Sequence, residues 1–226
     1  MTSGLSAAIA IAEKDILSQF RKKFEIFSMF LFALIAVLAF SFAVVTGGTV
    51  SEEIGSALLW VIIFFTGMFG FAPIFLSESE TGTLRGLATA PIPAWSVYLG
   101  KVIYGLFLMG FVEIFLIPII SVLFGFSIFN DIPLAIATLF VGTLDLAAVG
   151  SMASALTMPS ESKSTVFPLV YFPTATSGLM LLIEITKILV LGPGLIPLAL
   201  IFEILLAHLI AMLTLSASVF HYALSP

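Results

Sequence analysis

The chain has 226 residues, of which 61% are apolar and only 9% are charged. A typical soluble domain is about 45–50% apolar and about 25% charged, so a water-soluble fold could not hide this much apolar surface. The chain has no cysteine, which excludes disulfides, thiolate metal sites and a cysteine nucleophile. Its net charge of −5 gives no indication of nucleic-acid binding. These values predict a membrane domain.

The first 25 residues predict an amphipathic helix with a basic polar face. Apolar residues recur every three or four positions from Leu5 to Phe27, whereas Lys14, Arg21 and Lys22 lie off that stripe. We expect this helix to lie along the membrane interface as an elbow before the first span. The alternative is a soluble extension of the first span.

The remainder, residues 26–226, contains six long apolar runs. A helix needs about 20 mostly apolar residues to cross a bilayer, and backbone groups in lipid must be paired within their own segment. The sequence therefore predicts an all-α membrane protein with six transmembrane helices, at about residues 26–45, 54–76, 97–124, 132–158, 166–185 and 195–222. Small residues in the fourth run should allow close helix packing, namely Gly150, Ser151, Ser154 and Ala155. In the fifth run, Pro168 and Pro173 predict a kink or an interruption.

The distribution of positive charge predicts the orientation. Seven of the eight Lys and Arg residues fall on one side of the predicted spans: Lys14, Arg21, Lys22, Lys23, Arg85, Lys101 and Lys163. Only Lys187 falls on the other side. Because basic residues gather in cytoplasmic segments, we expect both termini to be cytoplasmic.

The most informative segment is the cytoplasmic connection after the second span. At about residues 78–90 it reads as a short helix with one apolar side, which Pro91 and Pro93 then end. A short helix that projects from the membrane suits docking in a groove of a cytoplasmic partner. A loop that merely joins two spans would explain the segment equally well. The residues that define it are Glu78, Glu80, Gly82, Thr83, Leu84, Arg85, Leu87 and Pro91.

This pattern, E-x-E-x-G-T-L-x-x-L followed by a proline turn and by Gly100-Lys101, resembles the permease subunits of type-2 ABC exporters. Within that group the chain resembles the haem exporter protein B (CcmB) family. Two features carry this closer resemblance, the Pro-x-Pro turn at Pro91 and Phe167-Pro168-Leu169-Val170 with the later Pro173. The resemblance covers nearly the whole chain and implies an ABC-2 permease fold of the type V exporter kind.

The resemblance also implies a mechanism and partners. Two copies of the permease would pair with two CcmA-like ATPase subunits in the plasma (inner) membrane, beside a CcmC-like haem-handling protein. The residues at about 78–90 and Pro91 would form a coupling helix to the ATPase, and haem would be the candidate substrate. The chain itself would bind no cofactor and would not be an enzyme. A P-loop would need a glycine where Trp95 stands, five residues before Gly100, so ATP must be hydrolysed by another chain.

Polar residues inside the predicted spans are the other candidates for function. A charged side chain at the bilayer centre costs about 2.5–3.5 kcal/mol on insertion scales, so such residues should face protein or water. They would form a polar path or a subunit interface, or else neutral acids hydrogen-bonded between helices. We interpret His208 as a helix-packing residue, because one histidine without a second partner gives weak support for an iron ligand. The candidates are Glu113, Asp145, Glu203 and His208.

Metal-ligand spacings and hydrolase motifs are absent from the sequence. Three interpretations of function therefore remain. The first is the permease of a haem exporter or haem-release complex. The second is a permease for another lipid-like or polymeric substrate. The third is a membrane scaffold for cytochrome assembly that transports nothing.

Overall fold

The computed structural model is all-helical over the part of the chain that it describes. The described residues are 4–21, 23–44, 50–75, 86, 91–125, 128–158, 163–192 and 194–223. Their helices are α1 (Gly4–Arg21), α2 (Lys23–Val44), α3 (Glu52–Phe71), α6 (Ala94–Phe124), α7 (Ile132–Thr157), α8 (Lys163–Leu191) and α9 (Leu198–Ala223).

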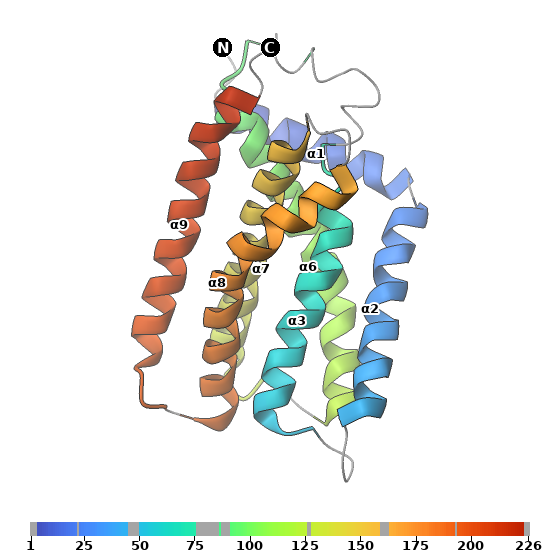
Figure 1. Cartoon of the computed structure of the whole chain (residues 1–226), viewed down its shortest axis with the longest axis vertical. Coiled ribbons are helices and arrows are strands. Elements are labelled where there is room, and N and C mark those ends of the chain that lie inside the picture. Colours follow the sequence, from blue (N-terminus) through green and yellow to red (C-terminus); the bar gives the residue numbers. More distant parts are fainter. Residues whose placement is uncertain are drawn as a thin grey trace.

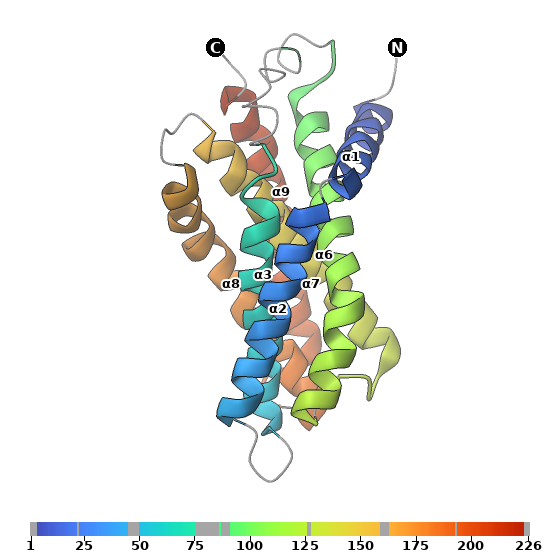
Figure 2. The same ribbon diagram turned by 90° about the vertical axis from the view of Figure 1, so that its right-hand side faces the viewer.

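Six of these helices, α2, α3 and α6 to α9, are long and apolar enough to cross a membrane. They run side by side along the long axis of the molecule, while α1 lies across one end of the bundle (Figures 1 and 2). This confirms the predicted class, an all-α membrane protein with six spans. The boundaries differ from the predicted ones by a few residues, chiefly because α8 extends to Leu191.

Helix α7 is the centre of the bundle, packing against α3, α6, α8 and α9. Two glycines allow these close approaches. A Cβ on Gly150 would overlap the ring of Phe71, and a Cβ on Gly142 would overlap the indole of Trp60. The Trp60 indole N–H donates to Thr186 Oγ1 at 2.7 Å, which joins α3 to α8 inside the bundle. The predicted close packing around Gly150 is therefore confirmed.

Helix α8 contains both of its prolines without a break. Each proline removes one backbone hydrogen bond and crowds the preceding turn, so a bend is expected. Figure 1 shows the first part of α8 leaning away from the direction of its second part. Of the two predicted outcomes, a kink or an interruption, the structure has the kink.

Helix α1 packs on the first half of α6. Its inward face consists of Ala8, Ile11, Ala12, Asp15 and Gln19, and a Cβ on Gly100 of α6 would lie 2.8 Å from the Ala8 carbonyl oxygen. Most of the apolar stripe expected from the sequence is not on this inward face, because Leu5, Ile9 and Phe20 are exposed. The exposed apolar side is suited to lipid, and the interfacial position of α1 stays a prediction.

Candidate functional site

A buried lysine lies at the junction of three helices, close to the segment that joins α3 to α6. The Lys101 ammonium lies 2.9 Å from Asp15 Oδ2 of α1 and donates to the Ile74 carbonyl oxygen at 3.0 Å. It also lies 4.9 Å from the centre of the Phe75 ring. Because the ammonium is desolvated and charged, it needs all of these partners. It thereby ties α1 and the end of α3 to α6.

The predicted coupling residues fall mainly outside the described part of the chain. Glu78, Glu80, Gly82, Thr83, Leu84, Arg85 and Leu87 all lie there. Within the described part, Pro91 is exposed just before α6, and Gly86 is exposed and helical. The coupling role of this segment stays a prediction.

Two of the four predicted intramembrane polar residues meet. Asp145 of α7 is fully buried, and its Oδ1 atom lies 2.9 Å from His208 Nδ1 of α9. The other ring nitrogen, His208 Nε2, lies 2.9 Å from Ser177 Oγ of α8. A Cβ on Gly178 would overlap Asp145 Oδ2, so glycine is what lets α8 come this close to the carboxylate. The three side chains link α7, α8 and α9.

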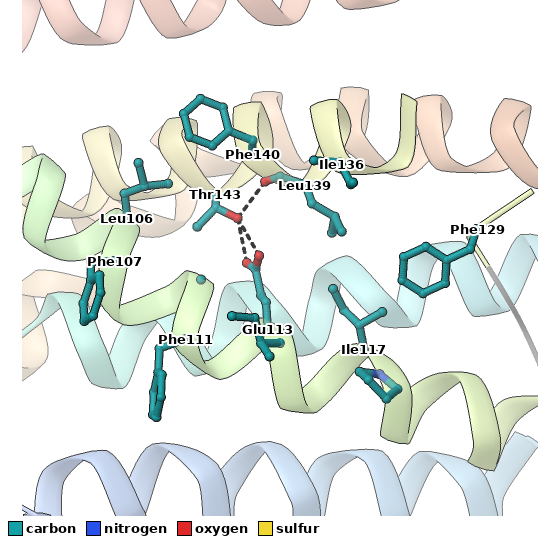
Figure 3. Close-up of a pocket in the computed structure, with 13 residues that line it drawn as sticks. Leu106, Phe107, Phe111, Glu113, Ile117, Phe129, Ile136, Leu139, Phe140 and Thr143 are labelled. Carbon is teal, nitrogen blue, oxygen red and sulfur yellow. Dashed lines mark hydrogen bonds between the residues drawn. The ribbon is translucent and has the colours of Figure 1, made fainter. Parts of the chain in front are cut away.

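Glu113 belongs to a different site, between α6 and α7. Its two carboxyl oxygens lie 2.7 and 2.8 Å from Thr143 Oγ1, and that hydroxyl also lies 2.7 Å from the Leu139 carbonyl oxygen. Figure 3 shows these contacts. The hydroxyl has a single proton, so it cannot donate to all three oxygens. We infer that Glu113 is a protonated acid that donates to Thr143 while Thr143 donates to Leu139.

Glu113 and Thr143 are among the residues that line an apolar cavity of about 630 Å³. Phe107, Ile136 and Phe140 line it and are also exposed, so it opens on the outer surface of the bundle. Figure 3 shows the lining side chains on both sides of the Glu113–Thr143 contact. The proton of the neutral Glu113 acid is taken up by Thr143, so the cavity offers apolar side chains and carboxyl oxygens and no cation. Such a cavity suits an uncharged chain more than an anionic group.

Glu203, the fourth candidate, lies exposed on α9. Thr143 and Asp145 are two positions apart on α7, so their side chains point to nearly opposite sides of that helix. Glu113 of α6 therefore contacts α7 on the side away from Asp145. The structure therefore joins Asp145 to His208 and separates both from Glu113. Whether any of these residues acts in transport stays a prediction.

Sequence reasoning did not single out Asp15, Thr143 or Ser177. Asp15 is one of several charges near the amino terminus, and serine and threonine are ordinary in transmembrane helices. A residue whose role is to pair with a buried polar group can be recognised only when the structure shows the two side chains in contact. Among the described residues, no three histidine or acidic side chains gather closely enough to hold a metal ion.

Comparison with known proteins agrees with this architecture. The family model described as "CcmB protein" matches residues 6–225. Heme exporter protein B of Pseudomonas aeruginosa is 23% identical over 154 residues, which cover 68% of this chain and 69% of that protein. Heme exporter protein B of Rhodobacter capsulatus is 29% identical over 151 residues, covering 65% of this chain and 69% of the relative. The chain therefore belongs to the CcmB protein family.

Proposed function

We propose that this chain is the permease subunit of an ABC transporter that moves or releases haem for cytochrome c maturation. Haem enters as the substrate because two relatives are named heme exporter protein B. A separate, CcmA-like subunit hydrolyses ATP, two copies of this chain form the permease, and a CcmC-like membrane protein handles haem beside it. Membership of the CcmB family over residues 6–225 is the observation that carries the proposal.

The packing around Lys101 supports the coupling part of this proposal. The segment that joins α3 to α6 leaves just after Phe75 and returns just before Ala94. Lys101 joins the two ends of this segment, because from α6 it donates a hydrogen bond to the Ile74 carbonyl just after α3. It also holds α1 through Asp15. A force applied by an ATPase to residues 78–91 would therefore reach α1, α3 and α6 together.

The arrangement of charge supports a cytoplasmic position for this end. Helix α1 and the ends of α6, α8 and α9 that lie near it share one end of the bundle (Figure 1). That end carries the described basic residues Lys14, Arg21, Lys23, Lys101 and Lys163, while Lys187 is near the other end. By the positive-inside rule, this distribution supports the proposed cytoplasmic position of both termini. The plasma (inner) membrane is part of the same proposal.

The absence of cysteine makes the orientation directly testable. Lys14→Cys and Leu195→Cys would each carry the only thiol, one on α1 and one at Leu195, which is fully exposed at the opposite end of the bundle. In intact cells, a membrane-impermeant maleimide should label Leu195→Cys and should reach Lys14→Cys only after lysis. Labelling in the reverse order would contradict the orientation.

Purification from the host in mild detergent tests the function. The tagged chain should retain an ABC ATPase and haem-handling membrane proteins. Leu84→Asp should abolish ATPase recovery and leave membrane insertion intact, because it places a charge on the docking side of the coupling segment. Leu195→Asp, the same change in an exposed position at the other end of the bundle, is the matched control and should retain the ATPase.

Each other outcome selects a different function. An ATPase recovered with lipid- or polysaccharide-pathway enzymes would keep the permease and discard haem. Recovery of cytochrome-assembly proteins with no ATPase would favour the scaffold. Normal ATPase recovery with Leu84→Asp would show that residues 78–91 do not form the docking site.

A further inference from the structure

Helices α6 and α7 touch closely in the half of the bundle nearer α1 and leave a cavity beyond that contact. A Cβ on Gly105 of α6 would lie 3.3 Å from the Cβ of Ala147 on α7. The lining of the cavity begins one residue later, at Leu106, and continues to Phe129 in the connection between the two helices. Figure 3 shows the lining side chains spread along both helices between these two residues. The far half of the α6–α7 contact is therefore not filled by the chain itself.

The cavity is long and narrow. Its lining on α6 runs from Leu106 to Pro118, which is about 18 Å along the helix axis. One leaflet of a bilayer has a hydrocarbon layer of similar thickness, about 15 Å. A volume of about 630 Å³ spread over this length gives a mean cross-section of about 35 Å². A helix about 10 Å in diameter has a cross-section of roughly 80 Å², so the cavity is too narrow for a helix and has room for one hydrocarbon chain.

The chemistry of the lining excludes water and charged groups as good occupants. All lining residues are apolar except Glu113 and Thr143, which are hydrogen-bonded to each other. A buried water molecule needs about two to four polar partners. No lysine or arginine of the described residues lines the cavity, so a phosphate or carboxylate would be desolvated there without a cation. An uncharged apolar chain is the ligand that matches this lining.

The cavity opens toward the lipid. Ile114 of α6 and Phe140 of α7 both line it, and they are 69% and 56% exposed. Helix α6 begins beside α1 and ends at the other end of the bundle, where Phe129 follows it (Figure 1). The opening therefore faces the leaflet opposite α1. An empty space at this position would deprive its lining of dispersion contacts, whereas a lipid chain from that leaflet would restore them.

Gly110 keeps the middle of the cavity open. It is one of the lining residues on α6, and a Cβ added to it would have nothing within 4 Å. In this respect it differs from Gly105, where the added carbon would meet the neighbouring helix. Close helix packing therefore does not require glycine at position 110. A larger side chain there would extend into the cavity and occupy the space that a ligand would use.

We propose that the cavity between α6 and α7 binds one acyl chain of a membrane phospholipid, taken from the leaflet opposite α1. The acyl chain completes the packing of α6 against the first half of α7 and covers the hydrogen-bonded pair of Glu113 and Thr143 from the surrounding membrane. This site goes beyond the proposed function, because it requires neither haem nor an ATPase.

Retention of phospholipid by the purified chain tests the proposal. The chain is reconstituted in nanodiscs of phosphatidylethanolamine and phosphatidylglycerol, each with a diazirine in one acyl chain, then extracted into detergent, washed free of loosely held lipid and irradiated. Native mass spectrometry counts the phospholipids on each chain, and peptide mapping locates the cross-links. We expect one retained phospholipid, cross-linked to lining residues such as Ile114 and Phe140, with either headgroup.

Two variants fill the cavity from opposite walls, and a third is the matched control. Gly110→Phe fills it from α6 and should reduce retention at least about 10-fold. Ile136→Trp fills it from α7, and because Ile136 is already 58% exposed, this change leaves the packed core intact if Gly110→Phe fails to fold. Val122→Phe adds the same side chain to an exposed position of α6 outside the cavity and should retain lipid as the wild type does.

Each contrary result overturns the proposal in a recognisable way. Equal retention by the wild type and Ile136→Trp, no retention by the wild type, or cross-links confined to other helices would show that lipid does not occupy this cavity. A preference of more than about 10-fold for one headgroup would show that the headgroup, and not the chain, is bound. A dimer that is lost in Gly110→Phe, with no retained lipid, would assign the cavity to a second copy. None of these results bears on haem or the ATPase, so the proposed function is tested separately.

Discussion

The two lysines that contact Asp15 provide a controlled measure of what burial does to an ion pair. Lys14 Nζ and Lys101 Nζ each lie 2.9 Å from a carboxylate oxygen of Asp15. The Lys14 side chain is 56% exposed, whereas that of Lys101 is 2% exposed. The distance and the acceptor are the same, so replacing each lysine with methionine compares the two environments.

Lys101→Met should be strongly destabilising. Removal of one partner of a buried pair typically costs about 3–5 kcal/mol, and this change also frees the Ile74 carbonyl. Because Lys14 remains beside Asp15, we expect the lower end, about 3 kcal/mol, or more than about 100-fold in the unfolding equilibrium. Lys14→Met removes an exposed pair and should cost less than about 1 kcal/mol.

The free energy of unfolding can be measured by denaturant titration in detergent micelles. The fluorescence of the two tryptophans reports it, since Trp60 is fully buried in the bundle. The double variant Lys101→Met with Asp15→Asn should recover part of the loss, because the carboxylate that lost its buried partner is gone. Equal losses for the two single methionine variants, or a loss below about 1 kcal/mol for Lys101→Met, would refute the reasoning from burial.

Three further changes test the packing of the bundle by the same measurement. Gly150→Val should cost at least about 1–3 kcal/mol, because its side chain would overlap the Phe71 ring. Gly110→Ala, with nothing within 4 Å of the added carbon, should be neutral or stabilising. Similar losses for the two variants would contradict the close approach of α7 to α3 at Gly150. Thr143→Val should cost about 1–3 kcal/mol by leaving the Glu113 acid without its partner, and an unchanged stability would argue against that hydrogen bond. Trp60→Phe should cost at least about 1 kcal/mol through the lost bond to Thr186, and combining it with Thr186→Val should add little if that bond is the cause.

The sequence alone determined the class of protein and the number of spans. Both depend on local composition, because any run of about 20 apolar residues in lipid must form a helix to pair its own backbone. Pro168 and Pro173 also predicted the bend in α8, since proline acts on the turn next to it. The loop pattern and the span-five residues were sufficient to indicate the CcmB family.

Only the tertiary structure decided which polar residues meet. Asp145 and His208 are 63 positions apart, and four intramembrane polar residues could be paired in several ways. The spans are apolar on nearly every side, so their sequences do not show which side faces inward. Packing set that rotation, placing Glu113 against Thr143 and Asp145 against His208. It also turned Asp15, an unremarked charge in the amphipathic segment, toward the buried Lys101, because a desolvated ammonium requires an acceptor.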